Sequence, residues 1–101
     1  MILYNVTVGI DADVESEWFE WMTQIHIPEV METGLFKKYE VYKILIQEEG
    51  ASPSYSIQYF AESMDDVETY LEEHAPGLMQ KHMSKYKNKH VAYRTLLEKV
   101  G

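Results

Sequence analysis

The fold is decided by residues 2–25, which read ILYNVTVGIDADVESEWFEWMTQI. Apolar side chains alternate along Ile2–Gly9, as in a β-strand, and then recur at helical spacing along Val14–Ile25. Beyond this stretch, alternation returns over Phe36–Gln47 and Tyr55–Phe60, helical spacing over Met64–Tyr86, and alternation over Val91–Leu97. The order strand, helix, strand, strand, helix, strand predicts an α+β, ferredoxin-like fold, in which a four-stranded antiparallel sheet carries both helices on one face.

Single residues predict where the helices begin and end. Asp11 or Asp13 is suited to accept hydrogen bonds from the free amides at the start of the first helix. Pro28 removes one backbone donor, so it predicts a kink or the start of a second short helix, which Gly34 then closes. Ser63 is the expected cap of the next long helix.

Composition indicates one compact domain over residues 1–101, because 46% of the residues are apolar and no linker or repeat interrupts them. The net charge of −8 disfavours nucleic-acid binding, which depends on attraction to phosphates. No apolar run approaches the roughly 18 residues of a membrane span, and the first residues do not resemble a signal peptide. The chain has no cysteine, which is compatible with the cytoplasmic location that we expect.

Charge is distributed unevenly along the chain. Seven acidic residues and no Lys or Arg lie between Asp11 and Glu32, whereas five basic residues and no acid lie between Lys81 and Arg94. One interpretation is that both stretches are solvated faces that keep the protein soluble. Another is that the basic stretch contacts the acidic helix of a second subunit.

Sorting each strand by its alternation suggests what lies on the two faces of the sheet. If the purely apolar sets meet the helices, the other face carries Asn5, Thr7, Gln58 and Arg94 among apolar neighbours. Such a face is too apolar for water, and its polar groups need hydrogen-bonding partners once they are buried. Two sheets packed face to face would meet both requirements, so we expect a homodimer.

At this point the sequence resembles a known group. The patterns Trp18-Phe19-Glu20-Trp21-Met22 and Ile25-His26-Ile27-Pro28-Glu29-Val30-Met31 resemble the dimeric α+β-barrel superfamily, whose members include cofactor-free antibiotic-biosynthesis monooxygenases and dye-decolourising haem proteins. Residues 17–42 and the ending Tyr93-Arg94-Thr95 are most similar to a small bacterial family known only as a domain of unknown function. The resemblance implies a homodimer with one cavity per subunit and implies no particular activity.

Two residues are candidates for catalysis. His26 lies just before the predicted kink, and an imidazole there suits a proton shuttle, with Glu29 close enough to orient it. Arg94 is the one arginine of an acidic chain, and its planar guanidinium suits a carboxylate, phosphate or enolate. The structural alternatives are a histidine bonded to a carbonyl or water, and an Arg–Glu ion pair.

Further candidates would line a ligand site. Trp18 and Trp21 are one helical turn apart and form either core packing or the wall of a pocket for a flat molecule. Tyr42 and Tyr59 fit a pocket lining or ordinary sheet packing equally well. Asn5 and Gln58 complete the expected ligand-binding set, with Asn5 beside Arg94 at a developing oxyanion.

We expect neither a metal nor a cofactor, since the four histidines lack metal-ligand spacing and only His26 or His90 is conceivable as a haem ligand. The sequence therefore predicts that a small aromatic or anionic molecule binds between the sheet and the first helix, with cofactor-free oxygenation as the reaction such a site would support. Two alternatives remain: a non-catalytic structural or regulatory homodimer, and a protein-interaction module that uses the acidic first helix. Whether the chain is an enzyme stays open.

Overall fold

The computed structural model describes residues 1–45 and 47–101, and it confirms the predicted order of elements. The elements are β1 (Ile2–Ile10), the 3-10 turn η1 (Ala12–Val14), α1 (Glu15–Trp21), the π-helical turn η2 (Met22–His26), α2 (Ile27–Glu32), β2 (Lys38–Lys43), β3 (Ser54–Ala61), α3 (Met64–Glu73), α4 (Ala75–Lys85) and β4 (His90–Glu98). The strand predicted over Phe36–Gln47 is shorter than expected. Ile46, which the alternation assigns to that strand, lies outside the described residues.

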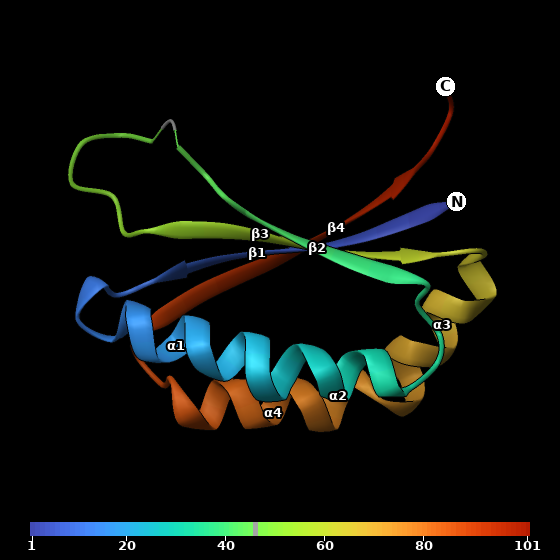
Figure 1. The fold of residues 1–101 in the computed structure, drawn as a ribbon, viewed down its shortest axis with the longest axis horizontal. Coiled ribbons are helices and arrows are strands. Elements are labelled where there is room, and N and C mark those ends of the chain that lie inside the picture. Colours follow the sequence, from blue (N-terminus) through green and yellow to red (C-terminus); the bar gives the residue numbers. More distant parts are fainter. Residues whose placement is uncertain (46) are drawn as a thin grey trace.

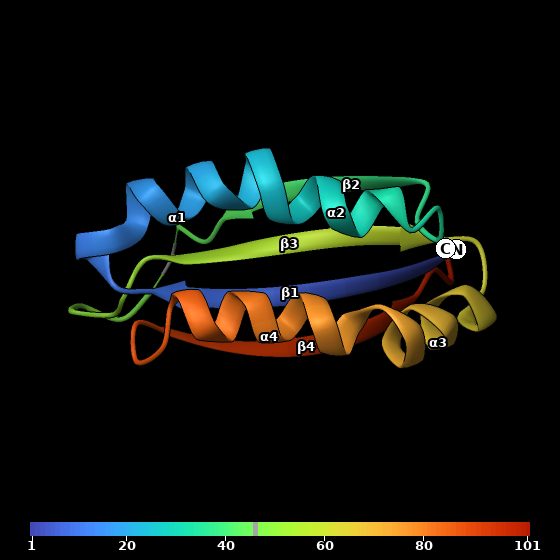
Figure 2. The same cartoon turned by 90° about the horizontal axis from the view of Figure 1, so that it is seen from below.

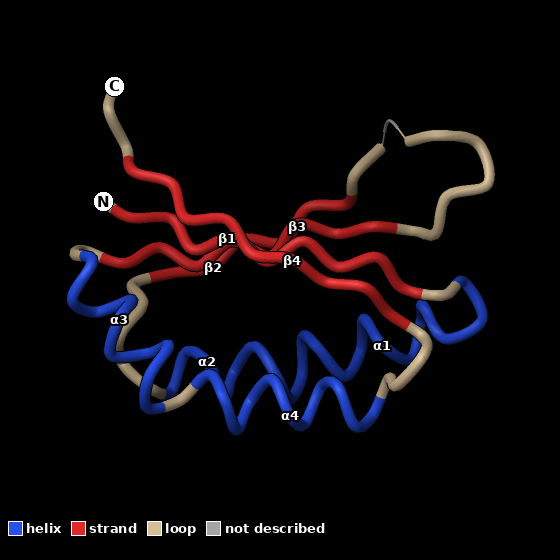
Figure 3. Tube along the Cα trace, turned by 180° about the vertical axis from the view of Figure 1, so that it is seen from behind, coloured by secondary structure: helices blue, strands red, loops and turns tan. Residues whose placement is uncertain are grey.

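The strands form one antiparallel four-stranded sheet in the order β2-β3-β1-β4. All the helices lie on one face of this sheet, and the other face is left open (Figures 1 and 3). Seen from the helical side, α1 and α2 run alongside β2 and β3, while α4 and α3 run alongside β1 and β4 (Figure 2). The predicted α+β architecture is therefore confirmed.

Most of the residues predicted to begin or end the helices do so in the structure. The Ser63 hydroxyl accepts a hydrogen bond from the Asp66 amide at 3.3 Å and caps α3. Gly34 adopts a left-handed φ of 77° just after α2. The prediction of an Asp11 or Asp13 cap is wrong, because neither side chain bonds a helix amide. Lys89 Nζ lies 3.0 Å from one carboxylate and 3.9 Å from the other, and so draws both outward.

Pro28 produces the second short helix that the sequence predicts. Its ring supplies no N–H and crowds the preceding turn, so a continuous α-helix is disfavoured there. The chain responds with η2, where the Ile27 amide bonds the carbonyl of Met22, five residues back. This wider turn inserts one extra residue before α2 begins at Ile27. It ends at His26, one of the two candidate catalytic residues.

The core lies between the sheet and the helical layer. Trp18, Ile27 and Val67 are among its helical members, each with at most 1% of the residue exposed. An aromatic group fills the end near α3, where the rings of Tyr4, Phe36, Tyr59 and Tyr70 lie with centroids 5.0–6.1 Å apart. Burial of these apolar surfaces is the main force that holds the helices on the sheet.

In strand β4, the side chains that face the helices are those that the prediction placed on the open face. Arg94 pairs with Val6 and Ala92 pairs with Val8, and paired residues of antiparallel strands share a face. Arg94 therefore lies on the helical side, and the prediction that it sits beside Asn5 and Gln58 is wrong. Asn5 and Gln58 do face each other across β1 and β3 on the open face, as expected.

This orientation of β4 is possible because its polar residues contact other polar side chains on the helical side of the sheet. Arg94 donates a hydrogen bond to the Tyr4 hydroxyl, and His90 lies against His82 of α4. The apolar set of β4 is then left on the open face, where Val91, Tyr93 and Leu97 are 72%, 64% and 47% exposed. The open face is consequently even more apolar than the sequence suggests.

The basic stretch contacts acidic residues of the same chain. Lys81 Nζ lies 2.7 Å from a Glu29 carboxylate oxygen, and Lys89 Nζ lies 3.0 Å from Asp13. These exposed pairs connect α4 and the turn after it to α2 and η1, so they do not require the acidic helix of a second subunit. Such exposed pairs contribute little to stability because water and salt screen them. Within the described ranges, no helix is long and apolar enough to span a bilayer.

Candidate functional site

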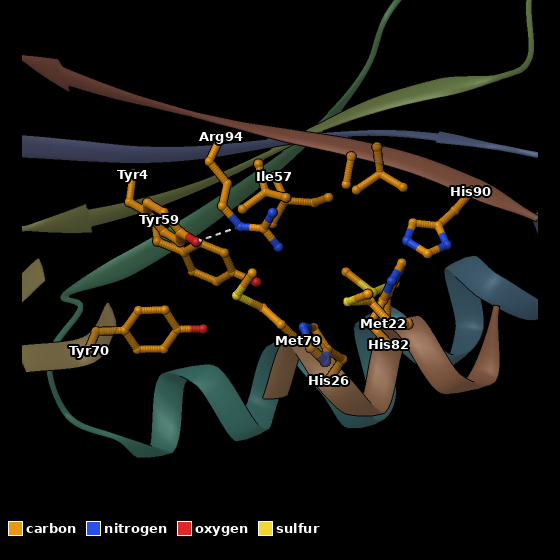
Figure 4. Close-up of a pocket in the computed structure, with 14 residues that line it drawn as sticks. Tyr4, Met22, His26, Ile57, Tyr59, Tyr70, Met79, His82, His90 and Arg94 are labelled. Carbon is orange, nitrogen blue, oxygen red and sulfur yellow. Dashed lines mark hydrogen bonds between the residues drawn. The ribbon is translucent and has the colours of Figure 1, made fainter. Parts of the chain in front are cut away.

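A cavity of about 200 Å³ lies between the sheet and the helices (Figure 4). Its wall comes from β1, β3 and β4 on one side and from η2, α3 and α4 on the other. The lining residues are Tyr4, Val6, Val8, Met22, His26, Ile57, Tyr59, Tyr70, Met79, His82, Met83, His90, Ala92 and Arg94. The site thus lies against the first helical run, as predicted, and equally against α4.

One end of the cavity carries a guanidinium among phenol rings. Arg94 points from β4 toward the helices, and its Nε donates to the Tyr4 hydroxyl at 3.0 Å (Figure 4). Burial raises the pKa of Tyr4, and burial likewise raises the pKa values of Tyr59 and Tyr70. These hydroxyls therefore stay protonated at neutral pH. Arg94 has no carboxylate within ion-pair distance in the described part of the chain.

The other end is lined by imidazoles. His82 Nε2 accepts a hydrogen bond from the Trp18 indole N–H at 2.9 Å, so the proton of its neutral ring lies on Nδ1. His90 Nδ1 lies 2.9 Å from the Tyr86 carbonyl oxygen and donates to it, because a carbonyl only accepts. The rings of His82 and His90 meet edge to face, with their centroids 4.6 Å apart.

His26 stands between these two ends. Its ring stacks on Trp21, with a centroid distance of 5.0 Å, and lies 5.9 Å from the His82 ring. Its Nδ1 is buried and makes no hydrogen bond to any of the described residues. An unpaired buried polar atom costs about 1–3 kcal/mol, so a hydrogen-bonding group that reached this atom would stabilise the site.

Two of the three imidazoles that line the cavity are neutral at neutral pH. Burial lowers the pKa of His26 to about 4 and that of His82 to about 3, so both rings are neutral near pH 7. Among the residues that line the cavity in the described ranges there is no Asp or Glu. The site therefore offers donors and a fixed positive charge to a ligand, without an acidic group that would repel an anion.

Only some of the residues predicted for the site line the same cavity in the structure. His26 and Arg94 line the same cavity, as the catalytic hypothesis requires. Asn5 and Gln58 lie on the open face, where each takes part in a hydrogen-bond chain through Ser56. The predicted pairing of Asn5 with Arg94 at an oxyanion is therefore wrong, since opposite faces of the sheet separate them.

The remaining predicted residues, Trp18, Trp21, Glu29 and Tyr42, do not line the cavity. Trp18 is a core residue and donates its indole N–H to His82, and the ring of Trp21 stacks on that of His26. Glu29 is occupied by Lys81. Tyr42 is 51% exposed on the open face and donates to Glu40 at 3.1 Å. Of the two interpretations of the tryptophans, core packing is the one that describes Trp18.

Tyr59, for which pocket lining was one of two interpretations, does line the cavity, whereas the sequence reasoning missed His82, Tyr4 and Tyr70 as site residues. His82 falls in the apolar stripe of α4, four residues after Leu78 and four before Tyr86, and all three are buried. A histidine at that spacing on an amphipathic helix was the available signal. In the part of the chain that the structure describes, no group of three or more acidic or histidine side chains is arranged to hold a metal ion.

We expect the free energy of unfolding to fall as the pH is lowered from about 6.5. Both imidazoles are neutral in the folded chain, because their pKa values lie at about 4 and about 3, whereas unfolded histidine titrates near 6.5. Above that pH neither state binds the proton, so stability is unchanged. Below it only the unfolded chain does, and stability falls by up to about 1.4 kcal/mol per pH unit for each ring.

Urea unfolding at pH 7.0 and pH 5.5, followed by circular dichroism, measures this slope above the range in which ordinary carboxylates titrate. The variant His74→Gln is the matched control, because His74 is a histidine outside the cavity and the slope should persist without it. Equal stability at both pH values would contradict the burial of neutral imidazoles.

The sheet order and the single helical layer define a ferredoxin-like α+β protein, and solved structures agree. A candidate antibiotic biosynthesis monooxygenase from Deinococcus radiodurans matches with a TM-score of 0.71 and 20% identity, over 100% of this chain and 94% of that chain. SnoaB, a cofactor-independent oxygenase from Streptomyces nogalater, matches with a TM-score of 0.67 and 14% identity, over 99% and 93%. A dimeric ferredoxin-like protein from an uncultured marine organism matches with a TM-score of 0.62 and 15% identity, over 99% and 95%. These identities establish a shared fold and no shared chemistry.

The chain belongs to the family described as Domain of unknown function (DUF4286), whose model matches residues 1–100. The resemblance to a family of unknown function on a ferredoxin-like fold is thereby confirmed. No curated protein matches the chain in sequence.

Proposed function

We propose that this protein binds a small aromatic anion in the cavity between the sheet and the helices. One observation carries the proposal: a chain with 17 acidic residues places its one arginine in a cavity whose described lining contains no acid. A guanidinium holds a carboxylate, sulfonate or phenolate through two parallel hydrogen bonds. The ligand would supply the negatively charged partner that Arg94 does not have among the lining residues.

The rest of the lining indicates the shape of the ligand. Met22, Ile57 and Met79 present apolar surface between the guanidinium end and the imidazole end. Methionine adapts to irregular ligands and makes favourable contacts with aromatic rings. A flat apolar body with one anionic group fits a cavity of about 200 Å³ with this distribution of polar groups.

Native mass spectrometry of the protein purified from its own host is the first test, because a retained ligand appears as added mass. Thermal unfolding with benzenesulfonate against benzenesulfonamide is the second. The two molecules share a ring and differ in charge, so the sulfonate should raise the melting temperature and the sulfonamide should not. Equal effects of the two would remove Arg94 from the recognition of the ligand.

A narrower proposal is that the bound molecule is an electron-rich phenol that the protein oxidises without a cofactor. Its support is the shared fold with a cofactor-independent oxygenase and the presence of His26 and Arg94 in one cavity. The imidazole would accept the phenolic proton and Arg94 would hold the phenolate. A ring carbon of the phenolate would then bond to dioxygen to give a hydroperoxide. Cleavage of its O–O bond with loss of the ring hydrogen would give a quinone, so that one oxygen atom of dioxygen enters the product and the other leaves as water. Dioxygen uptake with 1-naphthol tests this step, and a protein that binds the phenol without such uptake is a binding protein.

We also propose that two copies associate through their open sheet faces. Val91, Tyr93 and Leu97 are exposed there, with Thr95 between the last two, and large exposed apolar patches are rare on monomers. Asn5 and Gln58 would lie near the centre of the interface, where they already share hydrogen bonds with Ser56. The dimeric ferredoxin-like relative from a marine organism supports this assembly. A purely structural or regulatory homodimer would use the same face and leave the cavity empty.

The variant Tyr93→Lys should convert the dimer to a monomer at micromolar concentration, because it places a charge in an apolar interface. Sedimentation velocity measures the change. The matched control is Ile25→Lys, which alters a side chain that is 49% exposed on the helical layer and should leave the sedimentation coefficient as it was. A parent chain that sediments as a monomer would contradict the assembly itself.

A further inference from the structure

The ionisable side chains of the cavity wall are all basic or phenolic, whereas the whole molecule is acidic. The chain has a net charge of −8, yet the described lining combines Arg94 with His26, His82 and His90 and includes no acid. Three of the four histidines of the chain therefore face one small space. Each imidazole can add a positive charge to that space by taking up a proton.

The three imidazoles are not equally free to take up that proton. Nε2 of His82 is held by the Trp18 indole N–H, which would oppose a second proton at that position. Nδ1 of His90 donates to the Tyr86 carbonyl, so only its Nε2 is open to a further proton. His26 alone has a buried ring nitrogen without a hydrogen-bond partner within the described ranges, and its ring is clamped on Trp21. An imidazolium at His26 would need one new partner, and the cavity is where that partner can enter.

The charged groups around His26 explain why it stays neutral when no anion is present. Glu29 on α2 favours the protonated ring, whereas Lys81 on α4 and Arg94 on β4 oppose it. Glu29 is already engaged by Lys81 Nζ at 2.7 Å, which limits its help. His82 on α4 is the other titratable neighbour, with its ring centroid 5.9 Å away. Burial is the largest cause of the lowered pKa of His26, so a compensating negative charge inside the cavity would act strongly.

We propose that the cavity takes up its anion together with one proton from solvent, and that His26 carries this proton. The inference rests on the proposed function, since it needs an anion beside Arg94. The proton leaves a hydronium ion or water and bonds to the free ring nitrogen, and no bond between heavy atoms changes. One negative charge and one positive charge enter together, so the cavity keeps the net positive charge that Arg94 gives it, and the anion lies between two cationic donors.

This coupling defines the ligand class and a direction of regulation. The preferred ligand is an aromatic monoanion that accepts hydrogen bonds from both Arg94 and the His26 imidazolium. Because a proton binds with the anion, affinity rises as the pH falls, by up to tenfold per pH unit in the range where the bound imidazole is protonated and the free one is not. The protein would therefore hold its ligand in slightly acidic conditions and release it in alkaline ones.

Benzenesulfonate is the probe, because a sulfonate stays ionised throughout this range and any proton taken up must reside on the protein. Isothermal titration calorimetry at pH 6 and pH 8 gives the two dissociation constants. A pH-stat titration in unbuffered solution at the same two values counts the protons absorbed per anion bound. We expect tighter binding at pH 6 by several-fold, with more than about half a proton absorbed there and almost none at pH 8.

The variant His26→Gln should remove the proton uptake and flatten the pH dependence of binding, whereas the control His74→Gln should retain both. Binding of the sulfonate with equal affinity and no proton uptake at the two pH values would overturn the inference and leave the proposed function standing. Proton uptake that persists in a folded His26→Gln protein would overturn the assignment to His26. Failure of the parent chain to bind the sulfonate at all would instead count against the proposed function. The proton count of the parent chain is informative even if the variant does not fold.

Discussion

Replacing Trp18 with alanine is expected to lower the free energy of unfolding by about 3–5 kcal/mol, the cost typical of removing a buried large aromatic residue. Trp18 is 1% exposed, and its ring lies 5.1 Å from that of Tyr55, centroid to centroid. The substitution also removes the N–H that satisfies His82 Nε2. Since small domains are stable by only about 5–15 kcal/mol, this loss is a large part of the total.

Two companion variants separate packing from hydrogen bonding. Trp18→Phe keeps an aromatic ring in the core and loses the N–H, so it should cost about 1–3 kcal/mol, the penalty of an unsatisfied buried acceptor. Phe19→Ala removes the neighbouring aromatic residue, which is 40% exposed, and should cost less than Trp18→Ala. Urea unfolding at one fixed protein concentration measures all three, because an associating protein has concentration-dependent stability. A Trp18→Ala protein as stable as Phe19→Ala would mean that Trp18 is not part of the core.

The variant Arg94→Gln is expected to weaken benzenesulfonate binding by about tenfold to a hundredfold and to abolish its thermal stabilisation. Hydrogen bonds to a charged group contribute about 1.5–3 kcal/mol, and the glutamine amide retains polarity without charge or fork geometry. Arg94→Lys keeps the charge and loses the planar fork, so it should bind with intermediate affinity. Titration calorimetry of the three proteins measures the series.

The same variant discriminates the binding protein from a structural dimer. Arg94 faces the helices, because it pairs with Val6 on the helical side of the sheet. Its replacement should therefore leave the sedimentation coefficient unchanged while ligand binding is lost. A variant that dissociates into monomers and binds the sulfonate as well as the parent does would assign Arg94 to the assembly and not to the cavity.

The sequence predicted the fold well because several local signals agree with one architecture. Strand alternation, the proline at position 28, the glycine at position 34 and the serine cap at position 63 each produce the local structure that their chemistry favours. Consistency of this kind is what allows a short chain to specify one topology. The acidic cap at the first helix failed because Lys89, distant in sequence, competes for both carboxylates.

Only some residues of the candidate site could be predicted from the sequence, and strand β4 shows the reason. Both faces of this strand are partly apolar, so alternation alone does not identify the buried one. The sorting placed the purely apolar set under the helices, whereas hydrogen bonding to Tyr4 and contact with His82 bring Arg94 and His90 there instead. The identity of the buried face therefore depends on partners from other elements, which single-strand patterns do not contain.

The π-helical turn at Met22–His26 affects how this protein is compared with its relatives. Because the turn is closed by a hydrogen bond spanning five residues, it holds one more residue than an α-helical turn would. If a relative has an ordinary α-helical turn here, a gapless alignment shifts everything on one side of the turn by one position. The imidazole of His26 would then be matched with the wrong column, and its absence from a relative would be inferred where it is present. Structure-based superposition with a gap allowed inside the turn is therefore the sound basis for transferring residue roles within the family.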